Sequence, residues 1–366
     1  MTIIERGQAS SCNVPALQLF AVDPEDGFMR DIASGSYVIK KPDGTEAQAS
    51  TAINIADCPT GDRLGKGRYA AKWTVPTDAS TTPTGIYTIE WTYVIENPAG
   101  TLNTYNVTRS FEVAPAGVGI NPMGAYYASY GEVAELGLSG CQGKNATALL
   151  TLATQYIEKF TGNFFVPTPK NVRVDGTGSH AQLLREPIIA IADVAIDIAP
   201  FEPSDLPIDA SSLRVYNRHI RQGLTRPDDR DNPKLEFYHA FDRHGNKHAS
   251  FARLFFNRGE QNVGVEGVFG YTDPDGTPYG STPALITRAA LMLVVRNAIP
   301  ISDVEARQDQ QRAGQLEELR TRDQQVKWNF PSGVLGHHAF TGGFTGDPEI
   351  DTILMMYQKP IALART

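Results

Sequence analysis

Two histidines have the residue type and the spacing that a metal site requires. His244 and His248 are four residues apart, and Asp242 precedes them. Such a pair can share one metal ion when both side chains lie on one face of a helix. Here the residues between them are Gly, Asn, and Lys, which are typical of a turn. We therefore interpret the histidines as polar turn residues, and we predict no metal ligands.

Two loops contain further residues that could take part in chemistry. The segment 273–276, Asp-Pro-Asp-Gly, matches part of a calcium loop, but the later acidic ligands are missing, which favours a simple turn built on an aspartate side chain. Ser179 and His180 are adjacent in a glycine-rich stretch, but they have no nucleophile-elbow sequence and no placed acid. We therefore predict no catalytic residues and no cofactor, and we expect that the protein is not an enzyme.

Composition limits the classes of function that remain. The chain has 366 residues, of which 41% are hydrophobic and 20% are charged, and this is typical of a soluble globular protein with two or three domains. The longest apolar run is too short to cross a membrane, and the charged N-terminal segment predicts no secretion signal. The net charge of −8 argues against wrapping nucleic acid, because that requires many cationic side chains on the phosphates. It is compatible with DNA that passes without being held.

The cysteines give little support for disulfide bonds. Cys12, Cys58 and Cys141 are too few and too scattered for a disulfide framework. Cys12 and Cys58 could meet within one β domain, but we expect reduced thiols.

Residues 1–116 are predicted to form an all-β, immunoglobulin-like sandwich. Short candidate strands are separated by clusters of Gly, Pro, Asp and Ser, a spacing typical of a small sandwich. Two strands alternate with aromatic residues on one face, which predicts that Trp73, Tyr87 and Trp91 lie in the core between the sheets. The alternative is an exposed sugar-binding platform made by Trp91 and Tyr93. The candidate strands are 3–6, 14–22, 36–41, 67–75, 85–95 and 104–113.

The elements that follow change in periodicity. Residues 117–124 are predicted to be a linker that few contacts cross. Helices are predicted at about 129–139, which a capping box begins, and at 145–161, where apolar residues recur at three- and four-residue steps. A β-rich insertion, 165–270, precedes a third helix at 282–299. That helix is apolar on nearly every side, so we expect it in a core or between subunits.

The C-terminal part is predicted to contain a polar helix and a docking tail. Residues 302–328 begin with a capping box and are polar almost all round, so we expect this helix to contact neighbouring subunits or line a wet space. The alternative is a solvated helix on the surface. Residues 342–366 begin with glycines and continue into one short helix with a large apolar set, which is typical of a terminal segment that docks on a partner. The residues that we predict to bind a partner are Ile350, Ile353, Leu354, Tyr357, Lys359 and Pro360.

Four parts of the chain together resemble a known family. They are Tyr156–Phe165 at the end of the second helix, Val174–Ile188 in the β-rich insertion, Val265–Tyr271 before Thr282–Ile286, and Gly346–Asp351. In order and spacing they resemble the head-to-tail adaptor (connector, head-completion) proteins of tailed bacteriophages, from about residue 125 to residue 366. The resemblance implies an α+β chain, in which the immunoglobulin-like sandwich is followed by a helical-bundle adaptor domain that carries the β-rich insertion.

The resemblance also implies a function. Members of this family form a ring, commonly dodecameric, in the neck of the virion between head and tail, after assembly in the host cytoplasm. The ring binds the portal protein and the next neck or tail protein, continues the DNA channel without sequence-specific binding, and has no enzymatic activity. Family members are usually much smaller, so the N-terminal sandwich and the long insertion depart from the pattern.

Two other classes of function remain open. One is another virion component, such as a tail or decoration protein, which we disfavour because the middle and C-terminal parts are predicted to be helical. The other is a carbohydrate-directed enzyme with an accessory immunoglobulin-like domain. Such an enzyme requires a paired-carboxylate or metal site, and the sequence predicts neither.

Overall fold

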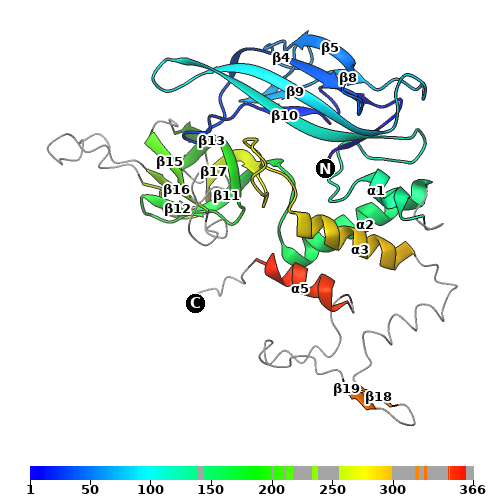
Figure 1. Cartoon of the computed structure of the whole chain (residues 1–366). Coiled ribbons are helices and arrows are strands. Elements are labelled where there is room, and N and C mark those ends of the chain that lie inside the picture. The colour runs from blue at the N-terminus through cyan, green and yellow to red at the C-terminus, as the bar shows by residue number, and fades with distance from the viewer. Residues whose placement is uncertain are drawn as a thin grey trace.

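The chain is mostly β-sheet, as a computed structural model shows (Figure 1). Strand accounts for 40% of the structure and helix for 19%, so the predicted helical-bundle adaptor domain is wrong. Within the described residues the strands of residues 3–114 and of residues 168–269 far outnumber the helices, so the sheets form most of the scaffold. The structure describes residues 1–137, 143–199, 202–208, 212–216, 233–237, 255–298, 318–320, 325–327, 345 and 347–359.

Residues 1–114 form a two-layer β-sandwich, which lies across the top of Figure 1. One layer is a five-stranded sheet in the order β1-β10-β9-β4-β5, in which β1 pairs with β10 in parallel and the other pairs are antiparallel. The other layer consists of β3-β7-β6 and β2-β8. The strands are β1 Ile3–Glu5, β2 Ala9–Ser10, β3 Gln18–Phe20, β4 Ile32–Lys40, β5 Glu46–Ala52, β6 Arg63–Gly65, β7 Arg68–Ala70, β8 Trp73–Thr74, β9 Gly85–Glu96 and β10 Leu102–Ala114.

The aromatic core of this sandwich is the one that alternation predicts. Trp73, Tyr87 and Trp91 are 8%, 0% and 1% exposed, which confirms the predicted core. Trp73 and Tyr87 both pack near the ring of Phe111. Tyr93 is also fully buried, so the exposed sugar-binding platform is wrong.

The predicted reduced state of two cysteines is also wrong. Cys12 and Cys58 form a disulfide that joins the segment after β2 to the loop between β5 and β6. They are 46 residues apart in sequence, and pairing of the strands between them brings them together. Cys141 lies outside the described residues.

A second β unit follows the second helix. A four-stranded sheet in the order β11-β17-β13-β14 lies next to a three-stranded sheet, β12-β16-β15, and side chains from both form one core. The central strand β13 is rich in Ile and Ala, and in β17 buried valines alternate with partly exposed residues. The strands are β11 Thr168–Gly176, β12 Ala181–Leu183, β13 Ile188–Ala199, β14 Glu202–Pro207, β15 Leu213–Tyr216, β16 Lys234–Phe237 and β17 Gly259–Phe269.

The two β units share a hydrophobic core. Ile189, Ala190, Ala192, Val268 and Tyr279 from the second unit belong to the same buried cluster as the sandwich side chains. The backbones also meet, because Ile191 accepts a hydrogen bond from the Met29 amide at 2.7 Å and donates one to the Gly27 carbonyl at 3.0 Å. The sandwich is therefore an integral part of the molecule.

Four helices pack together beneath the sandwich (Figure 1). They are α1 Tyr130–Glu135, α2 Gly143–Thr161, α3 Ala284–Ala298 and α5 Pro348–Met356. The capping box predicted for the first helix is present, since Ser129 Oγ accepts from the Glu132 amide at 2.9 Å and Glu132 accepts from the Ser129 amide. The core between the four helices also contains Ile3 of β1 and Ala114 of β10. Within the described residues, no helix is long and apolar enough to span a membrane.

The segment 117–124, predicted to be a linker with few contacts, packs closely. Val118 and Ile120 are buried in the helical core. The Glu5 carboxylate accepts hydrogen bonds from the amides of Gly117, Gly119 and Ile120. One carboxylate on β1 therefore fixes the entry of the chain into the helical part.

The polar helix predicted at 302–328 is wrong wherever the structure describes it. Residues 318–320 and 325–327 are antiparallel strands, β18 Glu318–Arg320 and β19 Gln325–Lys327, in which Leu319 is paired with Val326. The rest of that predicted helix lies outside the described residues. The many charged residues of this segment have good helix propensity, which explains the prediction. In the paired strands, however, the apolar residues Leu319 and Val326 lie opposite each other, and such cross-strand pairs stabilise a sheet.

Candidate functional site

The sequence predicted a docking site in the C-terminal segment, and the structure shows how that segment folds. Asp347 begins α5 by accepting hydrogen bonds from the amides of Glu349 and Ile350. Pro348 occupies the first turn, where its missing N–H costs nothing. Before the helix, the Thr345 hydroxyl donates to Asp351 Oδ1 at 2.7 Å. These contacts fix the position at which α5 begins.

Three of the predicted partner-binding residues point into the protein. Ile350, Ile353 and Leu354 are 0%, 5% and 0% exposed, and they lie in the helical core with side chains of α2 and α3. The face of α5 that carries the predicted docking residues is therefore covered within the chain. A contact of these residues with a partner stays a prediction. Arg288 of α3 and Glu349 of α5 form an exposed ion pair beside this face.

The segment after α5 joins the helices to the second β unit. The ring of Tyr357 packs edge-on against Phe165 and Tyr271, with ring centres 5.5 and 5.4 Å apart. The side-chain amide of Asn163 donates to the Tyr357 carbonyl at 2.8 Å. Tyr127 also packs edge-on against Phe165, with ring centres 5.5 Å apart. We call Tyr127, Phe165, Tyr271 and Tyr357 the aromatic junction.

Lys359 closes this arrangement. Its amide donates to the Thr161 carbonyl at the end of α2, at 3.0 Å. Its ammonium group is 3.0 Å from a carboxylate oxygen of Glu186, and both side chains are mostly buried. Burial lowers the pKa of Lys359, and the Glu186 carboxylate partly offsets this effect. Pro360, the remaining predicted residue, lies outside the described residues.

The junction brings together sequence segments that are far apart. The Thr282 hydroxyl at the start of α3 donates to the Phe165 carbonyl at 2.9 Å, and the Tyr271 amide after β17 donates to the Phe164 carbonyl at 2.7 Å. Two of the four segments that carry the family resemblance therefore meet here, and Tyr357, which follows α5, packs against both. Sequence reasoning missed Tyr127, whose hydroxyl accepts from the Phe165 amide and donates to Glu158. A tyrosine that follows Tyr126 directly and precedes a capping box gives no signal for that role.

The other residues that the sequence singled out have structural roles or are not described. Asp275 accepts from the amide and hydroxyl of Thr277, which confirms the predicted aspartate turn. The Ser179 hydroxyl donates to the Ala181 carbonyl within its own turn. His244 and His248 lie outside the described residues. In the parts of the chain that are described, no three or more His, Cys, Asp or Glu side chains are grouped so as to hold a metal ion.

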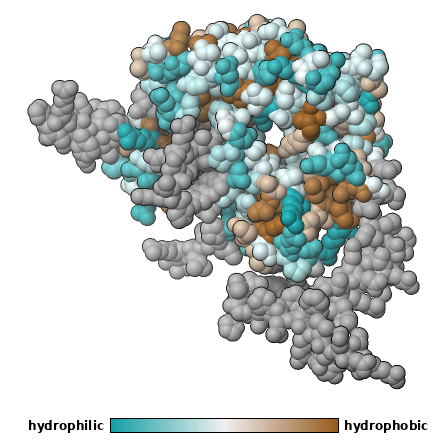
Figure 2. Space-filling view, viewed as in Figure 1, coloured by the Kyte–Doolittle hydropathy of each residue, from teal (hydrophilic) through white to brown (hydrophobic). Residues whose placement is uncertain are grey.

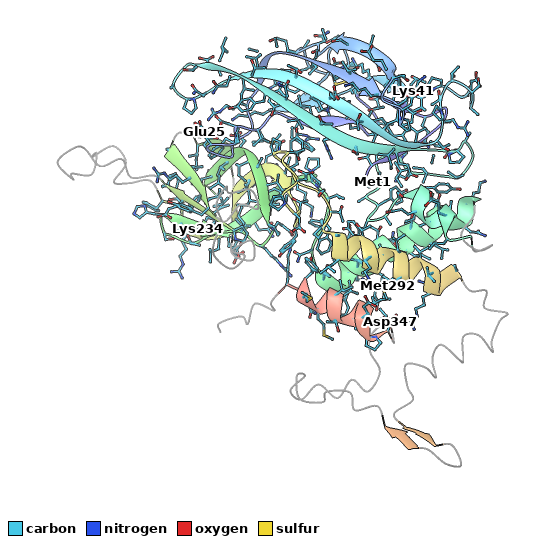
Figure 3. All side chains as sticks on the ribbon, viewed as in Figure 1. Met1, Glu25, Lys41, Lys234, Met292 and Asp347 are labelled. Atoms are coloured by element: carbon cyan, nitrogen blue, oxygen red, sulfur yellow. A yellow bond between two sulfur atoms is a disulfide. The ribbon has the colours of Figure 1, made fainter. Side chains whose placement is uncertain are left out.

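Apolar side chains are exposed on the helical part of the molecule. Leu152 and Tyr156 of α2 are 55% and 36% exposed, although both belong to the apolar residues at three- and four-residue steps that predict this helix. Met356 of α5 is 68% exposed. Figure 2 shows brown, hydrophobic side chains on the surface of the helical part. In the same view, Figure 3 labels Met292 of α3 and Asp347, which lie on the same side of the helical part. The buried face of α2 instead carries Leu150, Ala153 and Ile157, which lie in the helical core.

Comparison with known proteins adds no relative. No protein-family model matches the chain, and no curated protein matches it.

Proposed function

We propose that this chain is a structural protein of the tailed-phage neck, where it forms a ring between the portal and the tail. The observation that carries the proposal is the aromatic junction. The segments around Phe165 and Tyr271 resemble the adaptor family in sequence, and they meet at one place through ring contacts and a backbone hydrogen bond, where Tyr357 packs against both. A shared sequence pattern whose members pack together is expected of a common structural unit.

The proposed partners follow from the same resemblance. They are further copies of the chain in a ring, for which we propose twelve, the portal protein on one side, and the next neck or tail protein on the other. DNA passes through the lumen without sequence-specific contacts. The net charge of −8 supports this, because a cationic wall would hold the phosphates. The proposed location is the virion neck, and no enzymatic activity is proposed.

The β-rich fold favours one alternative. Tail and decoration proteins are mainly β, and strand exceeds helix here by 40% to 19%. A tail or decoration protein was disfavoured because the middle and C-terminal parts were predicted to be helical, but the chain is mostly strand. A tail or decoration protein is therefore the second candidate.

The test is to measure the mass of the purified chain, alone and mixed with portal-bearing capsids, by native mass spectrometry and electron microscopy. The neck proposal expects a free ring of the portal's order, or a monomer that becomes a ring on the portal. Binding along tails or over the capsid surface would support the second candidate. A monomer that ignores every particle and cleaves glycans would contradict both.

The predicted contact between the C-terminal segment and the portal can be tested with variants that leave the helical core intact. Met356 is 68% exposed on α5, and Met123 is 54% exposed in the segment before α1, so they form a matched pair of methionines. If the outer face of α5 contacts the portal, Met356→Glu weakens binding to portal-bearing capsids and Met123→Glu does not. Equal binding of both variants would contradict a contact at α5.

A further inference from the structure

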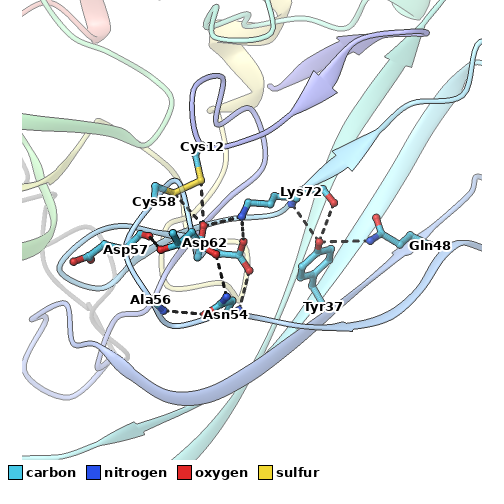
Figure 4. A network of polar contacts seen from close by, with 11 residues as sticks. Cys12, Tyr37, Gln48, Asn54, Ala56, Asp57, Cys58, Asp62 and Lys72 are labelled. Atoms are coloured by element: carbon cyan, nitrogen blue, oxygen red, sulfur yellow. Dashed lines mark hydrogen bonds and ion pairs between the residues drawn. A yellow bond between two sulfur atoms is a disulfide. The ribbon is translucent and has the colours of Figure 1, made fainter.

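The loop between β5 and β6 is held more firmly than a surface connection requires. We call residues 53–62 the stapled loop. Its ends are joined, because the Asp62 amide donates to the Asn54 carbonyl at 2.8 Å and the Asn54 amide donates to the Asp62 carboxylate at 2.8 Å. Figure 4 shows this network. A compact surface loop with closed ends is a common place for binding.

Two further links fix the loop to the sandwich. The disulfide joins Cys58 to Cys12, and the Lys72 ammonium contacts both Asp62 Oδ1 at 2.8 Å and the Gly61 carbonyl at 2.7 Å (Figure 4). A side chain at position 61 could not fit, because its Cβ would lie 2.0 Å from the Ala56 carbonyl oxygen. The loop is therefore rigid before any partner arrives, which reduces the entropy cost of binding.

A cavity of about 230 Å³ opens between the stapled loop and the sandwich. Its polar lining is Asp31, Asp57 and Arg63, and its apolar lining includes Ile55, which is 51% exposed. Tyr69 also lines the cavity, but it is fully buried and its hydroxyl donates to Asp31 Oδ1 at 3.3 Å. A sugar normally stacks on an aromatic face, so this lining does not suit a carbohydrate.

The three charged groups leave one carboxylate available. Asp31 holds Arg63 through both oxygens, at 3.0 and 2.8 Å, and it also accepts from the Gly67 amide. Asp57 contacts Arg63 at 2.6 Å through Oδ1, and its side chain is 74% exposed. Among the described residues, Asp57 Oδ2 has no hydrogen-bond partner. The cluster has a net charge of −1, which favours a cationic ligand.

We propose that the stapled loop binds a Lys or Arg side chain of a partner protein. The cationic group pairs with Asp57, and the aliphatic stem lies over Ile55, since long cationic side chains present both surfaces. A free metal ion fits less well, because Asp31 is already occupied and one carboxylate is too few ligands. This proposal gives the N-terminal sandwich a partner chemistry, and it does not depend on the neck proposal.

The test uses fluorescent peptides and the full chain. Three peptides differ only at the central residue of Gly-Leu-X-Leu-Gly, where X is Arg, Lys or Glu, and binding is followed by fluorescence anisotropy. The Arg and Lys peptides are expected to bind, and the Glu peptide is not. Asp57→Asn is expected to weaken binding about two- to fivefold, the range of an exposed ion pair. Higher salt should also weaken it.

Two controls separate the site from general charge and from misfolding. Asp43→Asn changes another exposed acid of the same sandwich, one that accepts hydrogen bonds from Thr45, and it should leave binding unchanged. Ile55→Ser should weaken binding without changing the melting temperature. Equal binding of the Glu peptide, no binding by any peptide, or equal effects of Asp57→Asn and Asp43→Asn would each overturn the proposal.

Discussion

Leu354→Ala tests whether α5 is part of the fold or a segment free to dock elsewhere. Leu354 is 0% exposed and lies in the helical core. The change removes three carbon atoms, and about 0.8 kcal/mol per buried methylene gives about 2.4 kcal/mol for their transfer. The cavity left behind adds to this, because buried leucines replaced by alanine cost about 3 to 5 kcal/mol in well-packed cores. We expect a loss of about 3 kcal/mol.

The loss should appear first in α5 itself. A loss of about 3 kcal/mol corresponds to roughly hundredfold faster amide hydrogen exchange, since each 1.4 kcal/mol is about tenfold. Hydrogen exchange with mass spectrometry on peptides covering 348–356 measures this directly. The matched control is Met356→Ala, which changes a side chain that is 68% exposed and should cost about 0.5 kcal/mol or less.

Unchanged exchange in Leu354→Ala would refute the reasoning. It would mean that the buried face of α5 contributes nothing in the free chain, and it would make that face available to a partner. The expected result has a practical consequence as well. Truncation after Gly346 removes Ile350, Ile353 and Leu354 from the core together, so lost portal binding by such a chain would report unfolding rather than a lost contact.

Three further changes test other parts of the structure. Tyr279→Ala removes a fully buried ring from the core shared by the two β units, and we expect a loss of about 3 to 5 kcal/mol in urea unfolding, against little for the exposed Tyr156→Ala. Burial raises the pKa of Glu112, and hydrogen bonds from amides at the start of α1 partly offset this rise. The pKa of Glu112 is therefore higher in the folded chain than in the unfolded chain. The free energy of unfolding then falls as pH rises from about 4 through the folded pKa. Glu112→Gln should remove that part of the pH dependence. If the free energy of unfolding changed with pH equally in the variant and in the original chain, the prediction would be contradicted. Replacing Cys12 and Cys58 together by Ser should cost about 4 kcal/mol for a closure across 46 residues, and no shift in the urea midpoint would show that the bond contributes nothing.

Local patterns predicted the elements whose neighbours are close in sequence. Strand alternation identified Trp73, Tyr87 and Trp91 as core residues, because a half-buried sheet requires an apolar face with period two. The capping box at Ser129 and Glu132 was found because all its groups lie within four residues. In contrast, β5 was missed, because its side chains are exposed or half-buried and show no alternation.

Long-range contacts were beyond what the sequence patterns could predict. The shared core depends on Val268 and Tyr279 meeting residues of the sandwich, at sequence separations far larger than any periodic window. The disulfide was missed for the same reason. The docking tail shows another limit of the sequence: Ile350 and Leu354 form an apolar face, and an apolar face fits a partner and the chain's own core equally well.

The shared core has a consequence for the first 116 residues, which the sequence suggested were an appended domain. Their removal would expose Ile189, Ala190, Ala192, Val268 and Tyr279, all buried against the sandwich. It would also remove Ile3 and Ala114 from the helical core, and the Glu5 carboxylate that holds residues 117–120. We therefore expect residues 117–366 alone to show no cooperative unfolding in urea, and to bind a dye specific for exposed apolar surface. An appended domain can be deleted without such effects. Cooperative unfolding of the shortened chain, with native exchange rates in α2 and α3, would contradict the shared core.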